Sequence, residues 1–383
     1  MTDPASERRR MSAVLVTKGV LTSPWLRTAV ESVPRERFLH PGVFLDEGRT
    51  WQPVVAADMA PDEWLKIAYS VDTLTTQLDG HLTAAQTDEP VVGVPTSSST
   101  DPATVVGMIE ALDLAAGHRV LEIGTGTGYS TALMCHYLGE DNVTTIEVDA
   151  QVAARADAAL EAVGFSTWTV TGDGLIGHPY RAPYDRVIAT CAVRRIPYAW
   201  IRQTKPGGIV LGTVGSWPWG TGLARLTVGD GGTAEGRIVE RSSFMQAMAP
   251  LAGDVSARAA YADSERHVLV SPLVLEEWMP AFLAQLAAPG AQLVRATGGD
   301  GSPLRYLFDP ERESFAEFLV DGESWTVRQG GPVALWDDVE RSLVAWQDAG
   351  APEIDSVRLR VTPASHQYWI DQVPSLRWEH RIT

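Results

Sequence analysis

Residues 119–149, RVLEIGTGTGYSTALMCHYLGEDNVTTIEVD, decide the fold of this chain. The apolar run at 120–123 is typical of a buried parallel strand, and apolar side chains recur at helical spacing over residues 129–138. Glycines at 124, 126 and 128 form a tight turn between them. A second strand, residues 143–148, carries Glu147 at its end, roughly 20 residues beyond the glycines, where such a unit places a carboxylate for ribose hydroxyls. The segment therefore predicts a site for an adenosine-containing cofactor.

The sequence motif of the turn favours S-adenosylmethionine over a nicotinamide or flavin nucleotide as the cofactor. It reads E-x-G-x-G-x-G, where a dinucleotide fingerprint reads G-x-G-x-x-G. Glu122 would repel a pyrophosphate, but it suits the ammonium and sulfonium of S-adenosylmethionine. A glycine turn without a ligand is disfavoured, because glycines, carboxylate and periodicity agree. The predicted cofactor-binding residues are Glu122, Gly124, Thr125, Gly126, Thr127, Gly128, Tyr129, Glu147, Val148, Asp173, Gly174 and Thr190.

Strands and helices alternate after this unit, which predicts a doubly wound, Rossmann-like α/β sheet. We expect a helix at 151–163, a strand ending in Gly172-Asp173-Gly174, a strand at 184–192, a helix ending near 204, a turn at 205–208 and a strand at 208–215. Asp173 would accept a hydrogen bond from the adenine amino group. Ligands bind at the carboxyl ends of parallel strands, and the predicted residues fall there.

The N-terminal hundred residues predict less regular structure. Residues 1–10 should be frayed, and two short helices are expected between Met11 and Val33. Residues 50–100 are expected to form an irregular lid with one strand near 66–70. A helix is expected to follow from Pro102 to Leu114.

Hydroxyl and carboxyl side chains gather where this last helix begins. Thr100, Ser99 and Asp101 are the candidate catalytic residues, with Ser98, Arg194 and Arg195 as candidates for binding the substrate. A helix start suits an anion, but it also suits a cap, which is the commoner role of one such residue. The two arginines are equally consistent with solvated surface charge.

Residues 233–383 lose the alternating pattern and predict a separate α+β region. Strands are expected at 267–270 and 358–361, and amphipathic helices at 275–286 and 333–346. Trp369 and Trp378 would fill the core or form a peptide-binding face. The expected domains are an N-terminal lid region (1–100), a cofactor-binding core (101–232) and the C-terminal region (233–383).

The composition of the chain restricts its expected binding partners and its cellular environment. The formal charge of −17 over 383 residues argues against nucleic acid. The two cysteines, Cys135 and Cys191, allow no disulfide framework or metal site, which indicates a reduced cytoplasmic protein. The sequence shows neither a signal peptide nor a long apolar segment, so no membrane association is expected. It does not decide the oligomeric state.

Collected together, the motifs of the first 220 or so residues resemble the protein-L-isoaspartate O-methyltransferase family. They are VPRERFLHP (33–41), Ala-Tyr (68–69), Thr100-Asp101-Pro102, RVLEIGTGTGYSTALM, Glu147, GDG (172–174), APYDRVI (182–188) and KPGG (205–208), in that order. The resemblance implies a seven-stranded sheet, S-adenosylmethionine as donor and S-adenosylhomocysteine as product. It also implies methylation of the carboxylate of an abnormal aspartate, whose ester then closes to a succinimide.

Two departures from the family suggest a finer reading. VVGVPTSS (91–98) replaces the usual proline- and glycine-rich substrate loop, and residues 233–383 are added. This long form resembles the branch associated with graspetides and some lanthipeptides. The expected substrate is then an aspartate of a ribosomally made, cyclised precursor peptide, whose ester closes to an aspartimide. Repair of damaged proteins is the alternative, and a non-catalytic S-adenosylmethionine-binding module is a third possibility.

Overall fold

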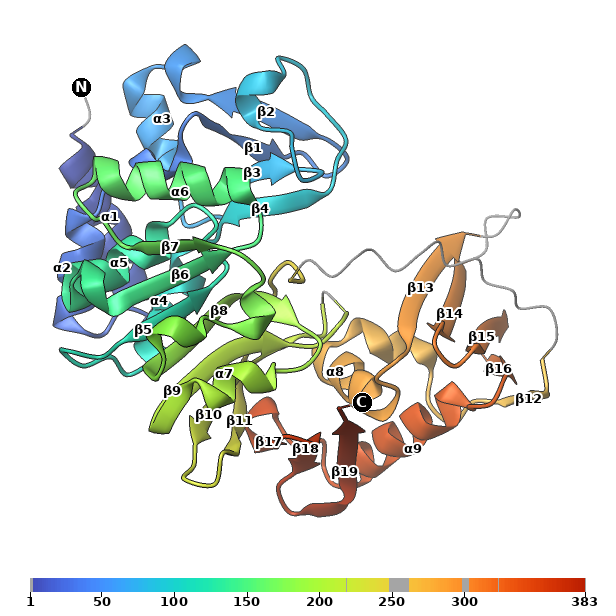
Figure 1. Ribbon diagram of the computed structural model, residues 1–383. Coiled ribbons are helices and arrows are strands. Elements are labelled where there is room, and N and C mark those ends of the chain that lie inside the picture. The colour runs from blue at the N-terminus through green and yellow to red at the C-terminus, as the bar shows by residue number, and fades with distance from the viewer. Residues whose placement is uncertain (1–2, 218, 248–261, 298–302, 323, 383) are drawn as a thin grey trace. The chain divides into compact units, whose positions relative to one another are not determined.

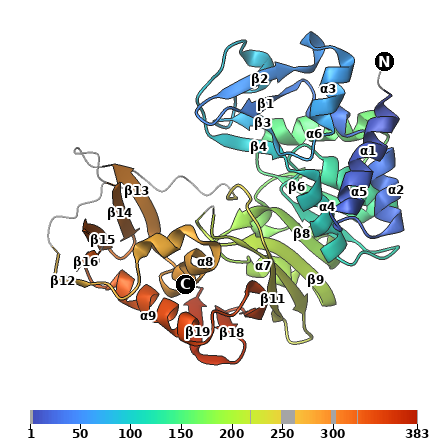
Figure 2. The ribbon, with the colours of Figure 1, turned by 180° about the vertical axis from the view of Figure 1, so that it is seen from behind.

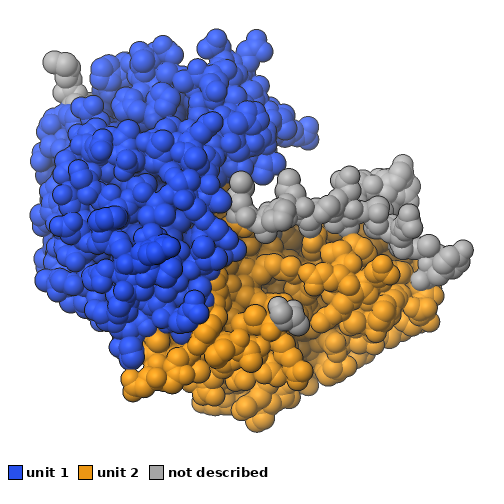
Figure 3. Space-filling view, viewed as in Figure 1, with its two compact units in different colours: residues 1–190, 199–211 blue, residues 191–198, 212–383 orange. Residues whose placement is uncertain are grey.

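The computed structural model describes residues 3–217, 219–247, 262–297, 303–322 and 324–382 (Figure 1). The chain divides into two compact units, of which unit 1 comprises residues 1–190 and 199–211 (Figure 3). Unit 2 comprises residues 191–198 and 212–383. The division passes through strands β8 (Tyr184–Val193) and β9 (Thr204–Val214). The glycine-rich segment 229–232, expected as a domain boundary, is instead the turn between two paired strands, β10 (Gly222–Val228) and β11 (Ala234–Arg241).

A largely parallel sheet forms the centre of unit 1, with the strand order β7-β6-β5-β8-β9. Strand β5 pairs in parallel with β6 and β8, and β6 pairs in parallel with β7. Val120 and Leu121 are fully buried, as expected for a parallel strand covered on both faces. The remaining bounds are β5 Val120–Ile123, β6 Val143–Glu147 and β7 Trp168–Thr171. The expected turn at 205–208 lies within β9.

Helices flank this sheet in both views of the ribbon (Figures 1 and 2). Asp149 explains where one of them begins, because its carboxylate accepts hydrogen bonds from the amides of Gln151 (2.8 Å) and Val152 (3.2 Å). The described helices of unit 1 are α1 Pro4–Thr17, α2 Pro24–Ser32, α3 Pro61–Ala68, α4 Pro102–Ala111, α5 Tyr129–Leu138, α6 Ala150–Ala162 and α7 Tyr198–Arg202.

The expectation of a frayed N-terminus is wrong for residues 4–10, which are helical. Asp3 caps α1 through the amide of Ala5, and Pro4 occupies its first turn. The Arg8 guanidinium also donates to the main-chain oxygen of Glu31 (2.9 Å), which ties α1 to α2. The two expected helices between Met11 and Val33 are confirmed.

Residues 42–99 form a small antiparallel sheet where an irregular lid was expected. Its order is β2-β1-β3-β4, with β1 Gly42–Asp46, β2 Trp51–Val55, β3 Leu74–Leu78 and β4 Pro95–Ser99. The strand expected at 66–70 is wrong, because most of that stretch lies in α3. Pro61, the acidic pair that follows it and Lys66 in the last turn all favour a helix there.

In its described residues, unit 2 combines antiparallel strands with two α-helices, which confirms the expected C-terminal α+β region. The strand expected at 267–270 is wrong except for His267, with which β12 ends. One sheet part has the order β10-β11-β17-β18-β19, and a second sheet has the order β12-β16-β15-β14-β13. The bounds are β12 Ser264–His267, β13 Gln292–Thr297, β14 Pro303–Asp309, β15 Ser314–Asp321, β16 Ser324–Gly330, β17 Val357–Val361, β18 Ser365–Ile370, β19 Val373–Arg381, α8 Trp278–Ala287 and α9 Leu335–Asp348.

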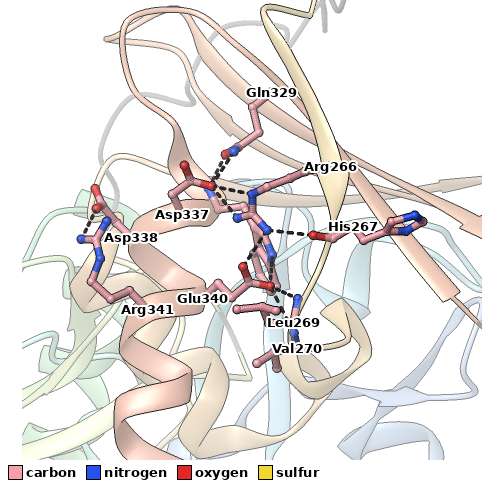
Figure 4. A network of polar contacts seen from close by, with 10 residues as sticks. Arg266, His267, Leu269, Val270, Gln329, Asp337, Asp338, Glu340 and Arg341 are labelled. Atoms are coloured by element: carbon pink, nitrogen blue, oxygen red, sulfur yellow. Dashed lines mark hydrogen bonds and ion pairs between the residues drawn. The ribbon is translucent and has the colours of Figure 1, made fainter.

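A polar network fastens α9 within unit 2 (Figure 4). The buried Glu340 carboxylate accepts hydrogen bonds from the amides of Leu269 (2.5 Å) and Val270 (3.1 Å), and it pairs with Arg266 (2.7 Å). Asp337, one turn earlier, accepts from the same arginine (2.5 Å). A buried carboxylate with this many donors is satisfied, so the network fixes the position of α9 against β12 and the segment after it.

Candidate functional site

The glycine-rich turn between β5 and α5 has the geometry that its sequence predicts. Gly124, Gly126 and Gly128 have φ angles of 89°, 54° and 89°, in the left-handed region that glycine tolerates. The amide of Gly126 donates to Glu147 Oε2 over 3.0 Å. The turn and the end of β6 are therefore joined directly, as the sequence pattern requires.

Glu147 is half-buried at the end of β6, next to solvent-exposed apolar surface. Its Oε1 accepts from the amide of Asp149 (3.2 Å), and burial raises the pKa of the carboxyl above its ordinary value. The next residue, Val148, is 50% exposed, and Ile176 is 63% exposed. A carboxylate at the end of β6 and exposed apolar side chains after β6 and β7 suit a ribose and an adenine ring.

Asp173 lies beyond the neighbouring strand β7 and is exposed. Its Oδ1 accepts from the amide of Leu175 (2.8 Å), so the carboxylate is oriented and retains acceptor capacity. A Cβ on Gly174 would lie 2.5 Å from Ile123 Cγ2, so this position requires glycine to pack on β5. The ends of β5, β6 and β7 thus gather predicted donor-binding residues.

Glu122 requires a correction, because it faces the core. Its side chain is fully buried, and its oxygens accept from the hydroxyls of Ser130 (2.5 Å), Thr131 (2.5 Å) and Thr145 (2.9 Å). Burial raises the pKa of this carboxyl. Glu122 therefore braces α5 and β6 behind the turn, and does not present its carboxylate to a ligand.

Other predicted residues also support the turn from behind. The Thr125 hydroxyl is buried 2.7 Å from that of Thr145, and the Thr190 hydroxyl donates to the main-chain oxygens of Gly124 and Ile123. Tyr129 is 3% exposed at the start of α5, and Thr127 is half-buried. Thr125 and Thr190 therefore brace the turn by hydrogen bonds, whereas Val148 and Asp173 are exposed beyond the ends of β6 and β7.

Asp101 is the cap of α4, which corrects its assignment as a catalytic residue. Its carboxylate accepts from the amides of Ala103 (2.8 Å) and Thr104 (3.1 Å) and from the Thr104 hydroxyl. Pro102 has no amide hydrogen, and the Asp101 amide donates to Thr73 Oγ1 (3.1 Å). The donors of this helix start are therefore already used, and the alternative that Thr100 caps the helix is wrong.

The hydroxyl-bearing end of β4 lies against the glycine turn. A Cβ on Gly126 would be 3.4 Å from the main-chain oxygen of Ser98, which places this strand end beside the predicted donor site. Thr100 and Ser98 are half-buried, whereas Ser99 is 3% exposed and its hydroxyl accepts from Arg35 (3.3 Å). Of the predicted hydroxyls, those of Ser98 and Thr100 therefore belong to partly exposed residues, whereas that of Ser99 is buried and bonded to Arg35.

Arg35 is a residue to which sequence reasoning gave no role. It is fully buried and donates to the main-chain oxygens of Ala68 (2.7 Å), Ser70 (2.9 Å), Asp72 (3.3 Å) and Thr100 (3.5 Å), besides Ser99 Oγ. Burial lowers its pKa to about 10, so it stays charged at neutral pH. The available signal was the VPRERF motif. Arg35 holds the end of β4 in place from inside unit 1.

Arg194 and Arg195 lie in unit 2 and make main-chain contacts there. Their guanidinium groups donate to the oxygens of Pro289 (3.0 Å) and Arg381 (3.1 Å). Both residues are exposed. These contacts favour a structural role, and substrate binding by the two arginines stays a prediction.

Neither cysteine is in a disulfide, and Cys135 is buried. Within the described ranges, no group of three or more His, Cys, Asp or Glu side chains is arranged to hold a metal ion. No helix in the described part of the chain has the length and apolar character needed to span a membrane.

Comparison with known proteins shows to which family the chain belongs. The model of the protein-L-isoaspartate(D-aspartate) O-methyltransferase family matches residues 72–246. Protein-L-isoaspartate O-methyltransferase 1 of Rhodopseudomonas palustris is 32% identical over 224 residues, which are 58% of this chain and 75% of that protein. The chain belongs to the protein-L-isoaspartate O-methyltransferase family. The predicted family is confirmed, and S-adenosylmethionine is the methyl donor of its members.

Other relatives match over a shorter part. The enzyme of Ignicoccus hospitalis is 42% identical over 133 residues, 34% of this chain and 62% of that protein. The enzyme of Methanosarcina mazei is 42% identical over 118 residues, which are 30% of this chain and 49% of that protein. The matched part therefore spans about half to two thirds of these relatives.

A solved structure titled protein-L-isoaspartate O-methyltransferase is similar with a TM-score of 0.57 and 23% identity. The match covers 95% of this chain and 99% of that one, which supports the fold as a whole. The predicted α/β methyltransferase fold with its additional C-terminal region is confirmed.

Proposed function

We propose that this protein methylates a side-chain carboxylate of an aspartyl-derived residue in a polypeptide, with S-adenosylmethionine as the donor. The observation that carries the proposal is the contact between two parts of unit 1. The hydroxyl run of β4 abuts the same glycine turn that holds Glu147. An acceptor carboxylate beside Thr100 would thus lie next to the donor site.

The residues at the strand ends fit the donor. The amide of Gly126 orients Glu147 to accept hydrogen bonds from two ribose hydroxyls. The amide of Leu175 orients Asp173, which accepts a hydrogen bond from the adenine amino group. Val148 and Ile176 offer apolar contacts to the adenine ring. When bound, the donor supplies a methyl group on a positively charged sulfur that is a good leaving group. Glu122 and Thr190 hold the glycine turn in its conformation and do not contact the donor.

The acceptor needs alignment more than a base. A carboxylate with a pKa near 4 is already ionised at neutral pH, so no residue of the chain has to remove a proton. The required task is to hold one oxygen in line with the methyl group and free of water. The Thr100 hydroxyl donates to the acceptor carboxylate, and Arg35 fixes the main chain on which that hydroxyl is carried.

We further propose that the natural acceptor is an aspartate in a ribosomally made, cyclised peptide, whose methyl ester then closes to an aspartimide. The exposed Val92 (79%) and Val94 (67%), which precede β4 in the unusual VVGVPTSS segment, support a dedicated peptide surface. Repair of isoaspartyl residues in damaged proteins is the second candidate. It is favoured by the names of the relatives and of the similar solved structure.

Three peptides with one sequence separate these functions: a linear aspartyl form, a linear isoaspartyl form and a side-chain-cyclised aspartyl form. The proposed function predicts the highest kcat/KM for the cyclised aspartyl peptide. A clear preference for the linear isoaspartyl peptide would establish repair instead. Failure to methylate any of a broad panel of aspartyl and isoaspartyl peptides, with the donor bound, would overturn carboxyl methylation and favour a non-catalytic binding module.

A further inference from the structure

Unit 2 contains a cleft of about 760 Å³ that the site described above does not use. Its walls come from the end of β11, the start of α8 and the segment after α9. Three tryptophans, Trp219, Trp278 and Trp346, line it together with Glu277 and Glu353. This volume lies within the range of ligand-binding pockets, and such pockets are commonly lined by aromatic side chains.

The three indole rings are held in place without a ligand. Their Nε1 atoms donate to main-chain oxygens: Trp219 to Leu275 (2.8 Å), Trp278 to Thr221 (2.8 Å) and Trp346 to Pro352 (3.0 Å). Trp278 also stacks on Phe282 with a ring separation of 5.0 Å. Because the polar atoms of these rings are satisfied, the cleft offers preformed aromatic surface, and little side-chain entropy would be lost on binding.

The charges around these rings favour a cation. Arg295 lies 4.2 Å from the centre of the Trp219 ring and Arg241 lies 5.6 Å from that of Trp278, so guanidinium groups of the chain itself already use this surface. Among the carboxylates of the lining, Glu276 pairs with Arg305 (2.7 Å). Within the described part of the chain, the exposed Glu277 and Glu353 carboxylates have no such pairing. Arg241, which also lines the cleft, has no ion pair there either, so two carboxylates face one guanidinium and a net negative charge is left for a ligand.

A second cleft in unit 2, of about 470 Å³, offers no comparable chemistry. It is lined by Arg237, Arg358 and Asp371 among others. Arg358 and Asp371 form an ion pair over 2.6 Å, so charges of opposite sign there compensate each other.

We propose that the tryptophan-lined cleft binds a segment of the polypeptide acceptor that carries a lysine or arginine beside an apolar side chain. The apolar group packs on the indole rings, and the cation lies between a ring face and the carboxylates of Glu277 and Glu353. This inference rests on the proposed function in taking the occupant to be the methyl acceptor. It assigns to unit 2 the task of capturing the acceptor by a part remote from its aspartate.

Binding is tested on the full chain with fluorescently labelled glycine-serine peptides that carry one leucine and two lysines, or one leucine and two glutamates. We expect the lysine peptide to bind and the glutamate peptide not to bind measurably. The double variant Glu277→Gln, Glu353→Gln should weaken the lysine peptide roughly 2- to 30-fold at low salt. The matched control is Glu311→Gln, an exposed carboxylate of unit 2 outside the cleft, which should leave the affinity unchanged.

A second pair of variants tests the aromatic wall. Trp346→Ala should weaken the lysine peptide, whereas Trp25→Ala, which removes a half-buried indole from α2 in unit 1, should not. Equal binding of the lysine and glutamate peptides, or equal effects of cleft and control variants, would overturn the proposal.

Methylation separates this inference from the proposed function. An isoaspartyl or aspartyl substrate extended by the lysine segment should have a lower KM than the unextended one, and the double variant should abolish that difference without changing kcat on the unextended peptide. Methylation with no effect of the extension would refute the cleft and leave the function standing. Cleft-dependent binding of the lysine peptide by a protein that methylates no peptide would refute the function alone.

Discussion

Thr100 and Asp101 are neighbours in the sequence, but their side chains do different work. The Asp101 carboxylate is committed to the first turn of α4, through two amides and one hydroxyl. The Thr100 side chain makes no hydrogen bond with the described residues and is half-buried, directly after strand β4, whose Ser98 main chain adjoins Gly126. The pair therefore allows catalysis and stability to be tested separately at adjacent positions.

Thr100→Ala should lower turnover roughly 10- to 1000-fold, because one oriented donor to the acceptor carboxylate is lost. Donor affinity and the melting temperature should change little, and Thr100→Ser should stay active because it keeps the hydroxyl. Asp101→Ala should lower the free energy of unfolding by about 1 kcal/mol, as expected for a lost cap. Single-turnover methylation and thermal melts on the same variants measure both effects. Full turnover by Thr100→Ala would remove Thr100 from the site.

Arg35 and Arg186 are both buried arginines of unit 1 that donate to main-chain oxygens. Replacing either by lysine should cost about 1 to 3 kcal/mol, because lysine cannot reach all of the acceptors. Only Arg35→Lys should also lower kcat of the folded protein, since only Arg35 holds the main chain of Thr100. Urea unfolding and steady-state kinetics distinguish the two. Equal kcat values for both variants would show that Arg35 acts on stability alone.

The sequence predicted residue types at the site better than it predicted their orientations. The strand-turn-helix pattern made the glycine turn, Glu147 and Asp173 predictable, because it places them by spacing alone. Glu122 was misassigned, because a strand residue can face either side and its three hydroxyl partners come from α5 and β6. Arg35 was missed, because its acceptors are main-chain oxygens, which have no sequence signature.

At the scale of elements, β18 carries a buried ionisable group that makes unit 2 sensitive to acid. His366 is fully buried, and its Nε2 lies 3.0 Å from the main-chain oxygen of Ile196. Burial lowers its pKa from 6.5 to about 4, helped by the nearby charges of His380 and Arg195. Since the unfolded state binds the proton first, the stability contributed by neutral His366 is full above pH 6.5 and is lost as the pH falls toward 4.

By pH 5 this loss should reach about 2 kcal/mol. His366→Gln keeps a donor for Ile196 but cannot titrate, so its free energy of unfolding should fall less between pH 7.5 and pH 5 than that of the unchanged protein. Urea titrations at the two pH values measure the difference. Identical pH dependence of the two proteins would contradict the assignment.

The elements that the sequence predicted correctly have local signals. Strand β5 (VLEI) is largely apolar, and apolar residues recur at helical spacing in α6 and α9. The small sheet was missed because β3 (LTTQL) and β4 (PTSSS) are polar and lack a clear alternation. Their pairing joins residues 17 to 25 positions apart, for example Leu78 with Pro95 and Leu74 with Ser99. Such a register comes from tertiary packing and not from local propensity.

At the scale of the whole molecule, the proposed methyl-transfer site and the tryptophan-lined cleft lie in different units. The proposed donor-binding and acceptor-binding residues lie in unit 1, and the family model, which matches residues 72–246, extends into unit 2. The tryptophan-lined cleft lies in unit 2. With 48 acidic against 31 basic side chains, the chain as a whole favours cationic over anionic partners. This balance agrees with an acceptor segment that carries lysine or arginine.

The most direct test of carboxyl methylation is the chemical stability of the transferred methyl group. The protein is incubated with labelled S-adenosylmethionine and the aspartyl, isoaspartyl and cyclised peptides, and the labelled peptide is then treated with mild base. A methyl ester releases its label as volatile methanol, whereas methyl groups on nitrogen or carbon stay bound. We predict label that is released as volatile methanol, either during the incubation as the ester closes or on treatment with base, and that Thr100→Ala greatly reduces. Label that survives base would contradict carboxyl methylation.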